Sequence, residues 1–314
     1  MNQTSLQIIL ASPRGFCAGV ERAVSIVEKA LEIYGAPVYV RHEIVHNQRV
    51  LRDLRAKGAV FVAKLDDVPE GAITVFSAHG VSQKVVDRAE ERQLPTIDAT
   101  CPLVTKVHSK GKNYAKKGYE IILIGHEGHP EVEGTMGRIE GVVHLVSTSQ
   151  DVQSLTIQND NKLAYITQTT LSVDDTKDII HALKQRFPNI QGGDVSDICY
   201  ATQNRQDAVR ALAKQVDMIF VMGAKNSSNS NRLQEIGIEL GVKSYLIESY
   251  HEIEMAWFQS VESIGITAGA SAPESVVQEL IEFLSQKYDV TVKTLETIKE
   301  DIYFNLPRQL RQVS

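Results

Sequence analysis

Long apolar runs and a basic start are both missing from this sequence. No stretch reaches the roughly 18 consecutive apolar residues that indicate a transmembrane helix, and the first ten residues contain neither Lys nor Arg. A secretory signal begins with basic residues before its apolar core. These absences argue against a membrane span and a signal peptide, and we expect a cytoplasmic protein with no membrane partner.

An excess of positive charge is missing as well. Lys and Arg together number 33 against 39 Asp and Glu, which gives a formal net charge of −6. Proteins that bind nucleic acid through a broad surface are strongly basic, because they neutralise phosphates. We therefore expect no nucleic-acid partner of that kind. With 43% hydrophobic and 23% charged residues, the 314-residue chain has the composition of a globular protein of two or three domains.

Cysteine is scarce, with only three in the chain, and no two of them lie close together. Cys17, Cys101 and Cys199 are poor candidates for a disulfide framework in a reducing compartment, and better candidates for metal binding or catalysis. Zinc sites normally contain close cysteine pairs, and none is present. No Gly-rich G-x-G-x-x-G stretch opens a helix, so a bound nicotinamide is not indicated.

What the sequence does contain is one structural context repeated three times. Each cysteine follows an apolar segment and precedes an amphipathic one, which predicts a strand-to-helix step at each cysteine. The three stretches are 8–24, 96–107 and 196–212, and the predicted helices span 18–34, 103–117 and 203–216. The cysteines lie 84 and 98 residues apart, which indicates a repeat of about 90 residues.

Each repeat continues with a second strand, a short strand and helix, and a third strand. Polar loops follow the second and third strands. The second strands with their loops span 37–47, 120–134 and 218–233, and the third strands with theirs span 74–82, 164–175 and 263–275. Strands that alternate with helices at this density are typical of parallel α/β units. No Gly/Ser-rich linker separates the repeats, so we expect them to pack continuously.

The predicted fold is therefore α/β, with three pseudo-repeated units whose mainly parallel sheets surround a central cavity in a trefoil-like, pseudo-threefold arrangement. The units are 14–99, 100–196 and 197–285, the last with the N-terminal strand 6–13, and 286–314 form a terminal segment that docks on the body. Ligands of parallel sheets bind beyond the carboxyl ends of the strands. The cysteines and polar loops all fall at such ends, so we expect them to converge on one cavity.

Three converging thiolates suit an iron–sulfur cluster or a zinc ion, and three inert buried cysteines are the plain alternative. A cubane cluster needs four ligands, so three cysteines leave one iron open to a substrate. A helix N-terminus beside each cysteine favours its thiolate form. The wide spacing favours the cluster over zinc.

The polar loops contain candidates for anion binding and proton transfer. Their histidines are His46, His79, His126 and His129, although a lone histidine is more often structural. The loop 223–231 and the segment around Ser271 offer hydroxyls, amides and a helix start, which suit either a helix N-cap or a phosphate. Glu131 is either a solvated glutamate or, in a closed cavity, a proton donor with a raised pKa. Gln168 and Thr169 occupy the equivalent strand end.

Lysines crowd the predicted helix after Cys101. They are Lys106, Lys110, Lys112, Lys116 and Lys117. Such a cluster is usually a solvated helix face, and the alternative is a docking surface for an acidic electron-transfer partner.

Nine strings in these segments resemble the 4-hydroxy-3-methylbut-2-enyl diphosphate reductase family, also called the LytB/IspH family. They are RGFCAGVERAV, EIVHN, FSAHGVS, DATCPLVTKVH, IGHEGHPEVEGTMG, TQTTLSVDDT, DICYATQNRQ, GAKNSSNSNRL and GITAGASAPE. Together they span residues 14 to about 274, and none departs from the family pattern.

The resemblance implies the last step of the non-mevalonate isoprenoid pathway, in which two electrons and two protons remove the hydroxyl of an allylic diphosphate as water. It implies that Cys17, Cys101 and Cys199 ligate a [4Fe–4S] cluster whose fourth iron takes the substrate hydroxyl. The positions it matches to diphosphate binding are His46, His79, Ser227, Ser228, Asn229 and Ser271. Those it matches to the allylic hydroxyl are His129, Glu131 and Thr169, with Glu131 as the proton source. A flavodoxin or ferredoxin is the implied electron donor.

Two other functions compete with this interpretation. A non-enzymatic iron–sulfur sensor would bind a cluster without holding a diphosphate. A zinc-dependent phosphate-ester hydrolase would contain zinc and neither iron nor sulfide.

Overall fold

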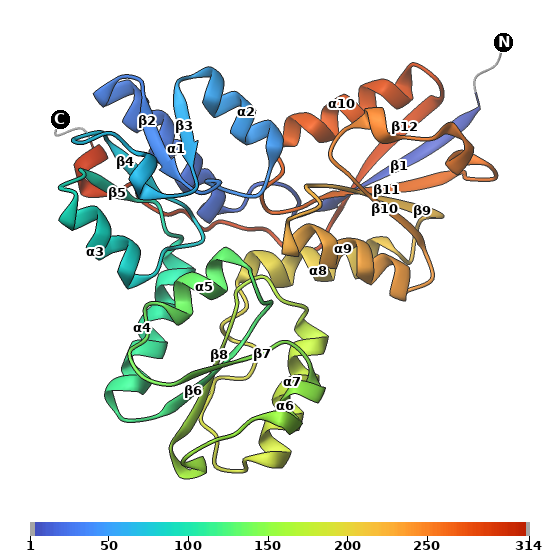
Figure 1. Cartoon of the computed structure of the whole chain (residues 1–314). Coiled ribbons are helices and arrows are strands. Elements are labelled where there is room, and N and C mark those ends of the chain that lie inside the picture. Colours follow the sequence, from blue (N-terminus) through green and yellow to red (C-terminus); the bar gives the residue numbers. More distant parts are fainter. Residues whose placement is uncertain (1–3, 312–314) are drawn as a thin grey trace. The chain divides into compact units, whose positions relative to one another are not determined.

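Parallel β-sheets flanked by helices make up the structure, a computed structural model that describes residues 4–311 (Figure 1). The sheets have five, four and three strands, and every strand pair is parallel. This confirms the predicted α/β class with parallel sheets. Among the helices of residues 4–311, none combines the length and the apolar character needed to cross a membrane.

The chain forms two compact units. Among residues 4–311, unit 1 contains 4–18, His46–Val50 and Tyr200–Tyr303, and unit 2 contains Gly19–Val45, Leu51–Cys199 and 304–311. The boundaries of three repeated units, 14–99, 100–196 and 197–285, stay a prediction.

Unit 1 is built on the five-stranded sheet, in the order β10-β9-β11-β1-β12. Its strands are β1 (Ser5–Ser12), β9 (Met218–Met222), β10 (Lys243–Ile247), β11 (Ser263–Ala268) and β12 (Asp289–Glu296). Its helices are α8 (Tyr200–Leu212), α9 (Ser228–Glu239) and α10 (Glu274–Ser285), with 3₁₀ turns η3 (Tyr250–Glu252) and η4 (Met255–Phe258).

The near-continuous apolar run of β1 is explained by burial on both faces. Ile8 and Leu10 pack in one core cluster with α10, whereas Ile9 and Ala11 pack in another with α8 and α9. Successive side chains of a strand point to opposite faces, so the run from Ile8 to Ala11, which is buried on both faces, is apolar throughout. The loop that contains Cys17 therefore follows a well-packed strand.

Unit 2 contains the four-stranded sheet β3-β2-β4-β5 and the three-stranded sheet β7-β6-β8. The strands are β2 (Val38–Arg41), β3 (Ala59–Val62), β4 (Thr74–Phe76), β5 (Thr96–Asp98), β6 (Glu120–Ile124), β7 (Val143–Val146) and β8 (Leu163–Thr167). The helices are α3 (Gln83–Glu91), α4 (Pro102–Lys116), α5 (Pro130–Met136), α6 (Ser149–Ser154) and α7 (Val173–Arg186). Unit 2 also contains α1 (Ala18–Tyr34) except its first residue and α2 (Gln48–Ala56) except its first three residues. The 3₁₀ turns are η1 (Leu65–Asp67), η2 (Asp160–Lys162) and η5 (Arg308–Leu310).

The predicted helices after the cysteines differ in how well they match the structure. The prediction for 18–34 coincides with α1, and that for 103–117 lies within one residue of α4. The helix predicted at 203–216 is α8, which begins three residues earlier and ends at Leu212. After Leu212 the chain approaches the five-stranded sheet, where the backbone N–H of Asp217 donates to the carbonyl of Ser263.

The prediction of a strand just before Cys199 is wrong. Within residues 187–199, all of which the structure describes, the sheet-like pairing is a single bridge between Gln191 and Ala164. Gly192 follows at a place where an added Cβ would collide with the ring of Tyr165, and Asp194 has a positive φ of 49°. The chain turns away there and cannot continue in an extended conformation.

The sequence predicts a short helix after the short strand that lies between the second and third strands of each unit. An α-helix forms at one of these three places. It is α6 after β7, whereas η1 after β3 and η3 and η4 after β10 are 3₁₀ turns.

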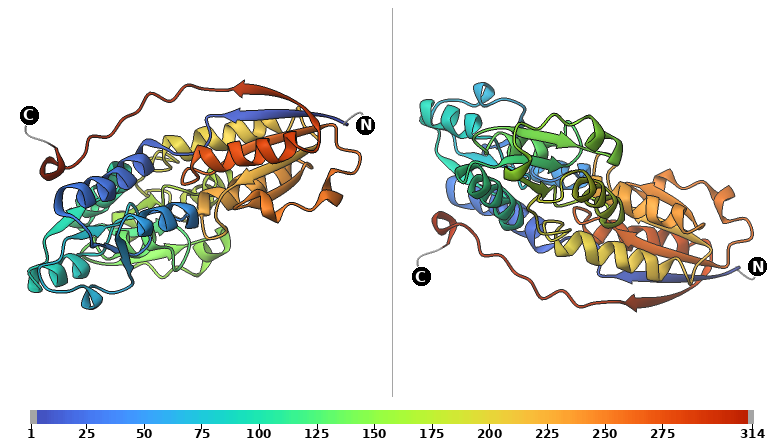
Figure 2. Two further views of the ribbon diagram at one scale, coloured as in Figure 1. Left: turned by 90° about the horizontal axis from the view of Figure 1, so that it is seen from above. Right: turned by 90° about the horizontal axis from the view of Figure 1, so that it is seen from below.

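The C-terminal segment, predicted as 286–314, extends the five-stranded sheet. Its strand β12 pairs with β1 over the whole length of both strands, from Ser5 opposite Asp289 to Ser12 opposite Glu296. Figure 2 shows β12 running alongside β1 at the sheet edge. The last three residues of the predicted segment lie outside the described residues.

Candidate active site

The three cysteines share one backbone environment. All are half-buried, and none forms a disulfide within residues 4–311. Each donates its backbone N–H to a carbonyl in a loop that follows a third strand. The three bonds are Cys17 to Ala270 (3.2 Å), Cys101 to Ala78 (2.9 Å) and Cys199 to Thr169 (3.0 Å). Ala78 and Ala270 directly precede His79 and Ser271, and Thr169 is itself a candidate. Each cysteine is therefore fixed beside a loop that contains a predicted substrate residue.

The cysteines also share a helix start. Cys101 is the N-cap of α4, while Cys17 and Cys199 directly precede α1 and α8. The positive end of a helix dipole and its unpaired N–H groups favour a thiolate, the form that binds iron. This donor set fits the predicted [4Fe–4S] cluster. The meeting of all three sulfurs at one point stays a prediction, because Cys17 belongs to unit 1 and the other two to unit 2.

A single metal ion requires a tighter arrangement of ligands than a cluster does. Among residues 4–311, no group of three or more His, Cys, Asp or Glu side chains is placed to hold such an ion.

Glu131 is the one acidic residue among the predicted site residues; it lies in unit 2 and is 2% exposed. Its Oε1 accepts the backbone N–H of Thr169 at 2.7 Å, and its Oε2 accepts the Thr169 hydroxyl at 2.8 Å. Burial raises the pKa of Glu131 to about 7, although both hydrogen bonds from Thr169 oppose that shift. A carboxyl with this pKa exchanges protons near neutral pH. Of the two roles considered for Glu131 from the sequence, its burial therefore favours the proton donor over the solvated glutamate.

His129 lies beside this acid as the N-cap of α5. Its Nδ1 accepts the backbone N–H of Glu131 at 3.1 Å, so a neutral His129 carries its proton on Nε2. The His79 ring meets the His129 ring edge to face, with 5.8 Å between centroids. Unit 2 thus brings together His79, His129, Glu131 and Thr169. His126, in contrast, is exposed and does not share this environment.

The remaining candidates lie in unit 1. The Ser271 hydroxyl donates to the backbone carbonyl of His46 at 2.9 Å. Ser227 is the N-cap of α9 and its hydroxyl accepts the backbone N–H of Ser230, so Ser228 and Asn229 occupy the first helical turn. A helix start of this kind presents N–H groups to an anion.

Asn229 has an unsatisfied amide. The residue is 4% exposed, yet within residues 4–311 neither its Nδ2 nor its Oδ1 has a hydrogen-bond partner. A buried amide without a partner costs roughly 1–3 kcal/mol, so such a group indicates a ligand that completes it. The amide therefore fits a diphosphate at the start of α9.

Three residues near the site escaped the sequence interpretation. Asn226 contacts the His46 ring, with 3.4 Å between its Nδ2 and Nδ1 of the histidine. Tyr200 has a raised pKa, first because of burial and then because of the nearby Cys17, so its hydroxyl stays protonated. Asp197, whose side chain is 3% exposed, pairs with Lys110 at 2.7 Å. No local sequence pattern indicates these contacts, because Asn226 lies 180 residues from His46 and Asp197 lies 87 residues from Lys110.

The structure also divides the lysine cluster. Lys106, Lys116 and Lys117 are exposed and Lys112 is half-buried, but Lys110 is bound to Asp197. Lys110 therefore does not belong to a free, solvated helix face.

Comparison with protein families and curated proteins gives a consistent result. The family model described as LytB protein matches residues 8–285. The 4-hydroxy-3-methylbut-2-enyl diphosphate reductase of Zymomonas mobilis is 58% identical over 308 residues, which cover 98% of this chain and 91% of that protein. Reductase 1 of Rhodopseudomonas palustris is 59% identical over 303 residues, which cover 96% of this chain and 99% of that protein.

Two solved structures are similar over most of the chain. The E-1-hydroxy-2-methyl-but-2-enyl-4-diphosphate reductase of Plasmodium falciparum has a TM-score of 0.93 at 38% identity, covering 99% of this chain and 97% of its own. A (E)-4-hydroxy-3-methyl-but-2-enyl diphosphate reductase, described as the terminal enzyme of the non-mevalonate pathway, has a TM-score of 0.65 at 31% identity. That likeness covers 90% of this chain and 99% of the other.

Proposed function

Because the chain belongs to the LytB protein family, we propose that it acts as a 4-hydroxy-3-methylbut-2-enyl diphosphate reductase, the terminal enzyme of the non-mevalonate pathway. The products are isopentenyl diphosphate and dimethylallyl diphosphate. Two electrons and two protons enter, the allylic C–O bond breaks, one proton leaves with the hydroxyl as water, and the other ends on carbon.

Cys17, Cys101 and Cys199 are the residues we propose to hold a [4Fe–4S] cluster. What supports this is that each lies at the start of a helix and is anchored by its own N–H to a loop of the site. When bound, the cluster supplies electrons one at a time and a Lewis-acidic iron.

Glu131 is the group that holds the proton needed to release water. The observation that carries this proposal is its burial, which sets its pKa near 7 while Thr169 orients both carboxylate oxygens. A protonated Glu131 in that position donates to the leaving oxygen as the oxygen gains negative charge. His129, bound to the backbone of Glu131, and Thr169 keep the carboxyl in place and line the allylic end of the substrate.

The diphosphate end of the substrate is assigned to His46, His79, Ser227, Ser228, Asn229 and Ser271. Support comes from the start of α9, which presents backbone N–H groups, and from the unsatisfied amide of Asn229. Hydroxyls, amides and imidazoles hold an anion through directed hydrogen bonds.

Electrons come from a small acidic carrier, a flavodoxin or ferredoxin. The exposed lysines of α4 and the residue after it support this proposal, because a positive patch favours encounter with an acidic protein. We also place the enzyme in the cytoplasm, where a reducing environment keeps cysteines free for iron.

Anaerobic reconstitution of the full chain with iron and sulfide tests the function. We expect about four irons per chain, as a [4Fe–4S] centre requires, and a spectrum that changes when the allylic diphosphate is added. Inorganic pyrophosphate is the matched control, since it occupies the diphosphate site without an allylic hydroxyl and should leave the iron spectrum nearly unchanged. Zinc in place of iron, or a spectrum indifferent to the allylic substrate, would contradict the proposal.

A further inference from the structure

Each helix that follows a cysteine carries a cationic side chain that binds residues just before a different cysteine. Arg22 on α1 binds the loop before Cys101, Lys110 on α4 binds the loop before Cys199, and Arg205 on α8 binds the loop before Cys17. The partners are the carbonyls of Ala99 and Thr100, the carboxylate of Asp197, and the carbonyls of Gly15 and Phe16. Each contact joins two residues of the same compact unit: those of Arg205 lie in unit 1, and those of Arg22 and Lys110 lie in unit 2.

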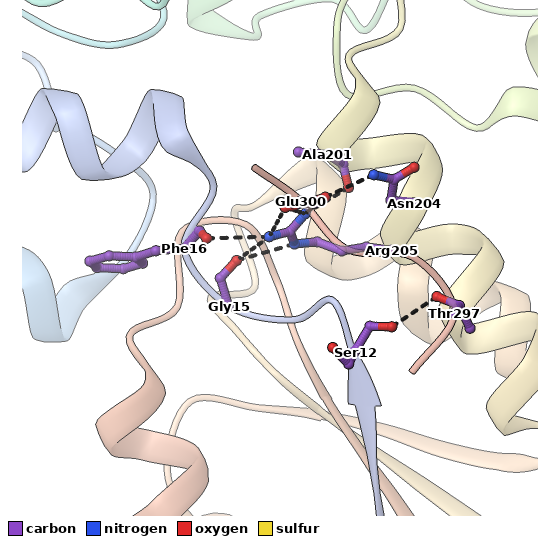
Figure 3. A network of polar contacts seen from close by, with 8 residues as sticks. All are labelled: Ser12, Gly15, Phe16, Ala201, Asn204, Arg205, Thr297 and Glu300. Atoms are coloured by element: carbon purple, nitrogen blue, oxygen red, sulfur yellow. Dashed lines mark hydrogen bonds and ion pairs between the residues drawn. The ribbon is translucent and has the colours of Figure 1, made fainter. Parts of the chain in front are cut away.

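Arg205 makes the most complete of the three attachments (Figure 3). It is fully buried. Its Nη2 and Nε donate to the carbonyl of Gly15 at 2.7 and 3.1 Å, and Nη2 also reaches the carbonyl of Phe16 at 3.3 Å. Its charge is balanced by Glu300, whose Oε1 lies 3.1 Å from Nη1. A buried arginine that binds two successive carbonyls just ahead of Cys17 restricts where that cysteine can lie.

Arg22 makes the equivalent attachment in unit 2. Its Nη1 donates to the carbonyls of Thr100 at 3.0 Å and Ala99 at 3.3 Å, the two residues before Cys101. Its Nε donates to the backbone carbonyl of Asn305 at 2.9 Å. The C-terminal segment therefore touches this arginine as well.

The third attachment is made by Lys110, which binds a carboxylate side chain where the two arginines bind backbone carbonyls. Its Nζ lies 2.7 Å from Oδ2 of Asp197, two residues before Cys199. The exposed fractions of the two side chains are 22% and 3%. A pair this well shielded from water restricts the loop more than an exposed ion pair would.

The C-terminal segment reinforces two of the three attachments. Glu300 binds Arg205, and the carbonyl of Asn305 binds Arg22. Thr297 also donates its N–H and its hydroxyl to the carbonyl of Ser12, at 2.9 and 2.8 Å, where β1 ends (Figure 3). This segment lies beyond residue 285, where the match to the family model ends.

We propose that Arg205, Arg22 and Lys110 are positioning residues for Cys17, Cys101 and Cys199, and that residues 297–305 fasten the first two. In each attachment, a residue on the helix after one cysteine binds the loop before another cysteine. The three attachments together include each helix and each loop once. The significance for iron binding rests on the proposed function, but the attachments themselves do not.

Hydrogen exchange on the full chain, with and without iron, tests the attachments one at a time. The variants are Glu300→Gln, Arg22→Gln and Lys110→Gln, read in peptides covering 12–18, 97–102 and 195–200. Arg22→Gln and Lys110→Gln remove the donor to the loop, and Glu300→Gln removes the anion that holds Arg205 in place. Each variant should raise exchange about tenfold in its own peptide, the factor expected from losing one charge-assisted hydrogen bond, and less than about twofold in the other two. An equal rise in all three peptides, or no rise in the matching one, would overturn the proposal.

Glu239→Gln is the matched control, because Glu239 also pairs with a buried arginine of unit 1, Arg232, at 2.6 Å but touches none of the loops. It should leave all three peptides unchanged. Lys110→Arg keeps a cationic donor and should restore slow exchange in 195–200, which a loss of general stability would not allow. If Lys110→Arg exchanges as fast as Lys110→Gln, the positioning role of Lys110 is wrong.

Release of iron to a chelator links the attachments to the cluster. We expect release several-fold faster in the three variants than in Glu239→Gln, as for ligands that lose their outer hydrogen bonds. Faster exchange with unchanged iron release would refute the positioning role for the cluster. Failure of the unmodified chain to bind iron would instead contradict the proposed function, while the exchange pattern would still decide whether the attachments exist.

Discussion

Thr169 gives both of its hydrogen-bond donors to one carboxyl group, that of Glu131. The N–H reaches Oε1 at 2.7 Å and the hydroxyl reaches Oε2 at 2.8 Å, and Glu131 is 2% exposed. Two effects on the pKa of Glu131 therefore oppose each other, since burial favours the neutral acid and the hydrogen bonds from Thr169 favour the carboxylate. A pKa of about 7 for Glu131 results. The group can hold and release a proton at physiological pH.

Replacing Glu131 by Gln should slow turnover by about 10²- to 10⁴-fold, the usual contribution of a positioned acid. Glutamine keeps the shape of the side chain but has no proton of suitable pKa. Iron content and pyrophosphate affinity should not change, and both are measured alongside turnover. Glu133→Gln is the control, because Glu133 lies on the same helix and is exposed. Near-normal turnover of Glu131→Gln would remove this residue from the proton path.

The raised pKa of Glu131 makes folding stability depend on pH. The folded pKa, about 7, lies above the ordinary value of 4.5, so between these values the folded chain binds a proton that the unfolded chain releases. Its contribution is fully present below pH 4.5 and is lost as pH rises through 7. Relative to Glu131→Gln, the iron-free chain should lose roughly 3 kcal/mol of unfolding free energy across that range. Urea unfolding of both proteins at pH 5 and pH 8 measures this, and parallel curves would contradict the assignment.

Thr169→Val should raise the pKa of Glu131 further, because one donor to the carboxylate is lost while burial remains. We expect the alkaline limb of the turnover-against-pH profile to move upward by roughly one pH unit. Thr169→Ser retains a hydroxyl and should leave the limb in place. If the valine and serine variants give the same profile, the hydroxyl of Thr169 does not control the pKa of Glu131.

Asn229→Ala should weaken pyrophosphate binding about tenfold, as expected for one hydrogen bond to an anion, without lowering the unfolding free energy. The reason is that both amide atoms of Asn229 are buried without partners within residues 4–311, so their removal costs the folded state little. Asn231→Ala is the opposite case. Its Nδ2 already donates to the carbonyls of Lys225 and Ser227, so this variant should lose about 1 kcal/mol of stability. Calorimetric binding and urea unfolding distinguish the two, and a stability loss for Asn229→Ala would contradict the assignment.

Converting Lys112 and Lys116 together to Glu should slow reduction by a flavodoxin or ferredoxin several-fold, because a like-charged surface repels an acidic carrier. Reduction by a small dye should not change. Lys64→Glu with Lys84→Glu changes the charge equally at exposed positions outside α4 and serves as the control. Equal slowing with carrier and dye would rule out a docking role for α4.

The strand-to-helix step at Cys17 and Cys101 was predictable, because it depends on neighbouring residues. A buried strand needs an apolar run and a helix needs an apolar face, and both patterns are local. The same argument failed before Cys199, where Gly192 packs against Tyr165 and prevents an extended strand. That packing partner lies 27 residues earlier in the chain, so no local pattern could signal it.

The sequence by itself determined which side chains are available for chemistry: three separated cysteines, a glutamate after a histidine, and hydroxyls and amides at a helix start. Only the tertiary structure decided what those groups can do, since burial and hydrogen bonding come from residues far along the chain. Burial raises the pKa of Glu131, and the fold places Thr169, 38 residues along the chain, where its hydrogen bonds oppose that shift. The loop before Cys17 is held by Arg205, 190 residues away, and Arg205 by Glu300, 95 further on. The free energy of a proton or a charge depends on its surroundings, and folding creates those surroundings.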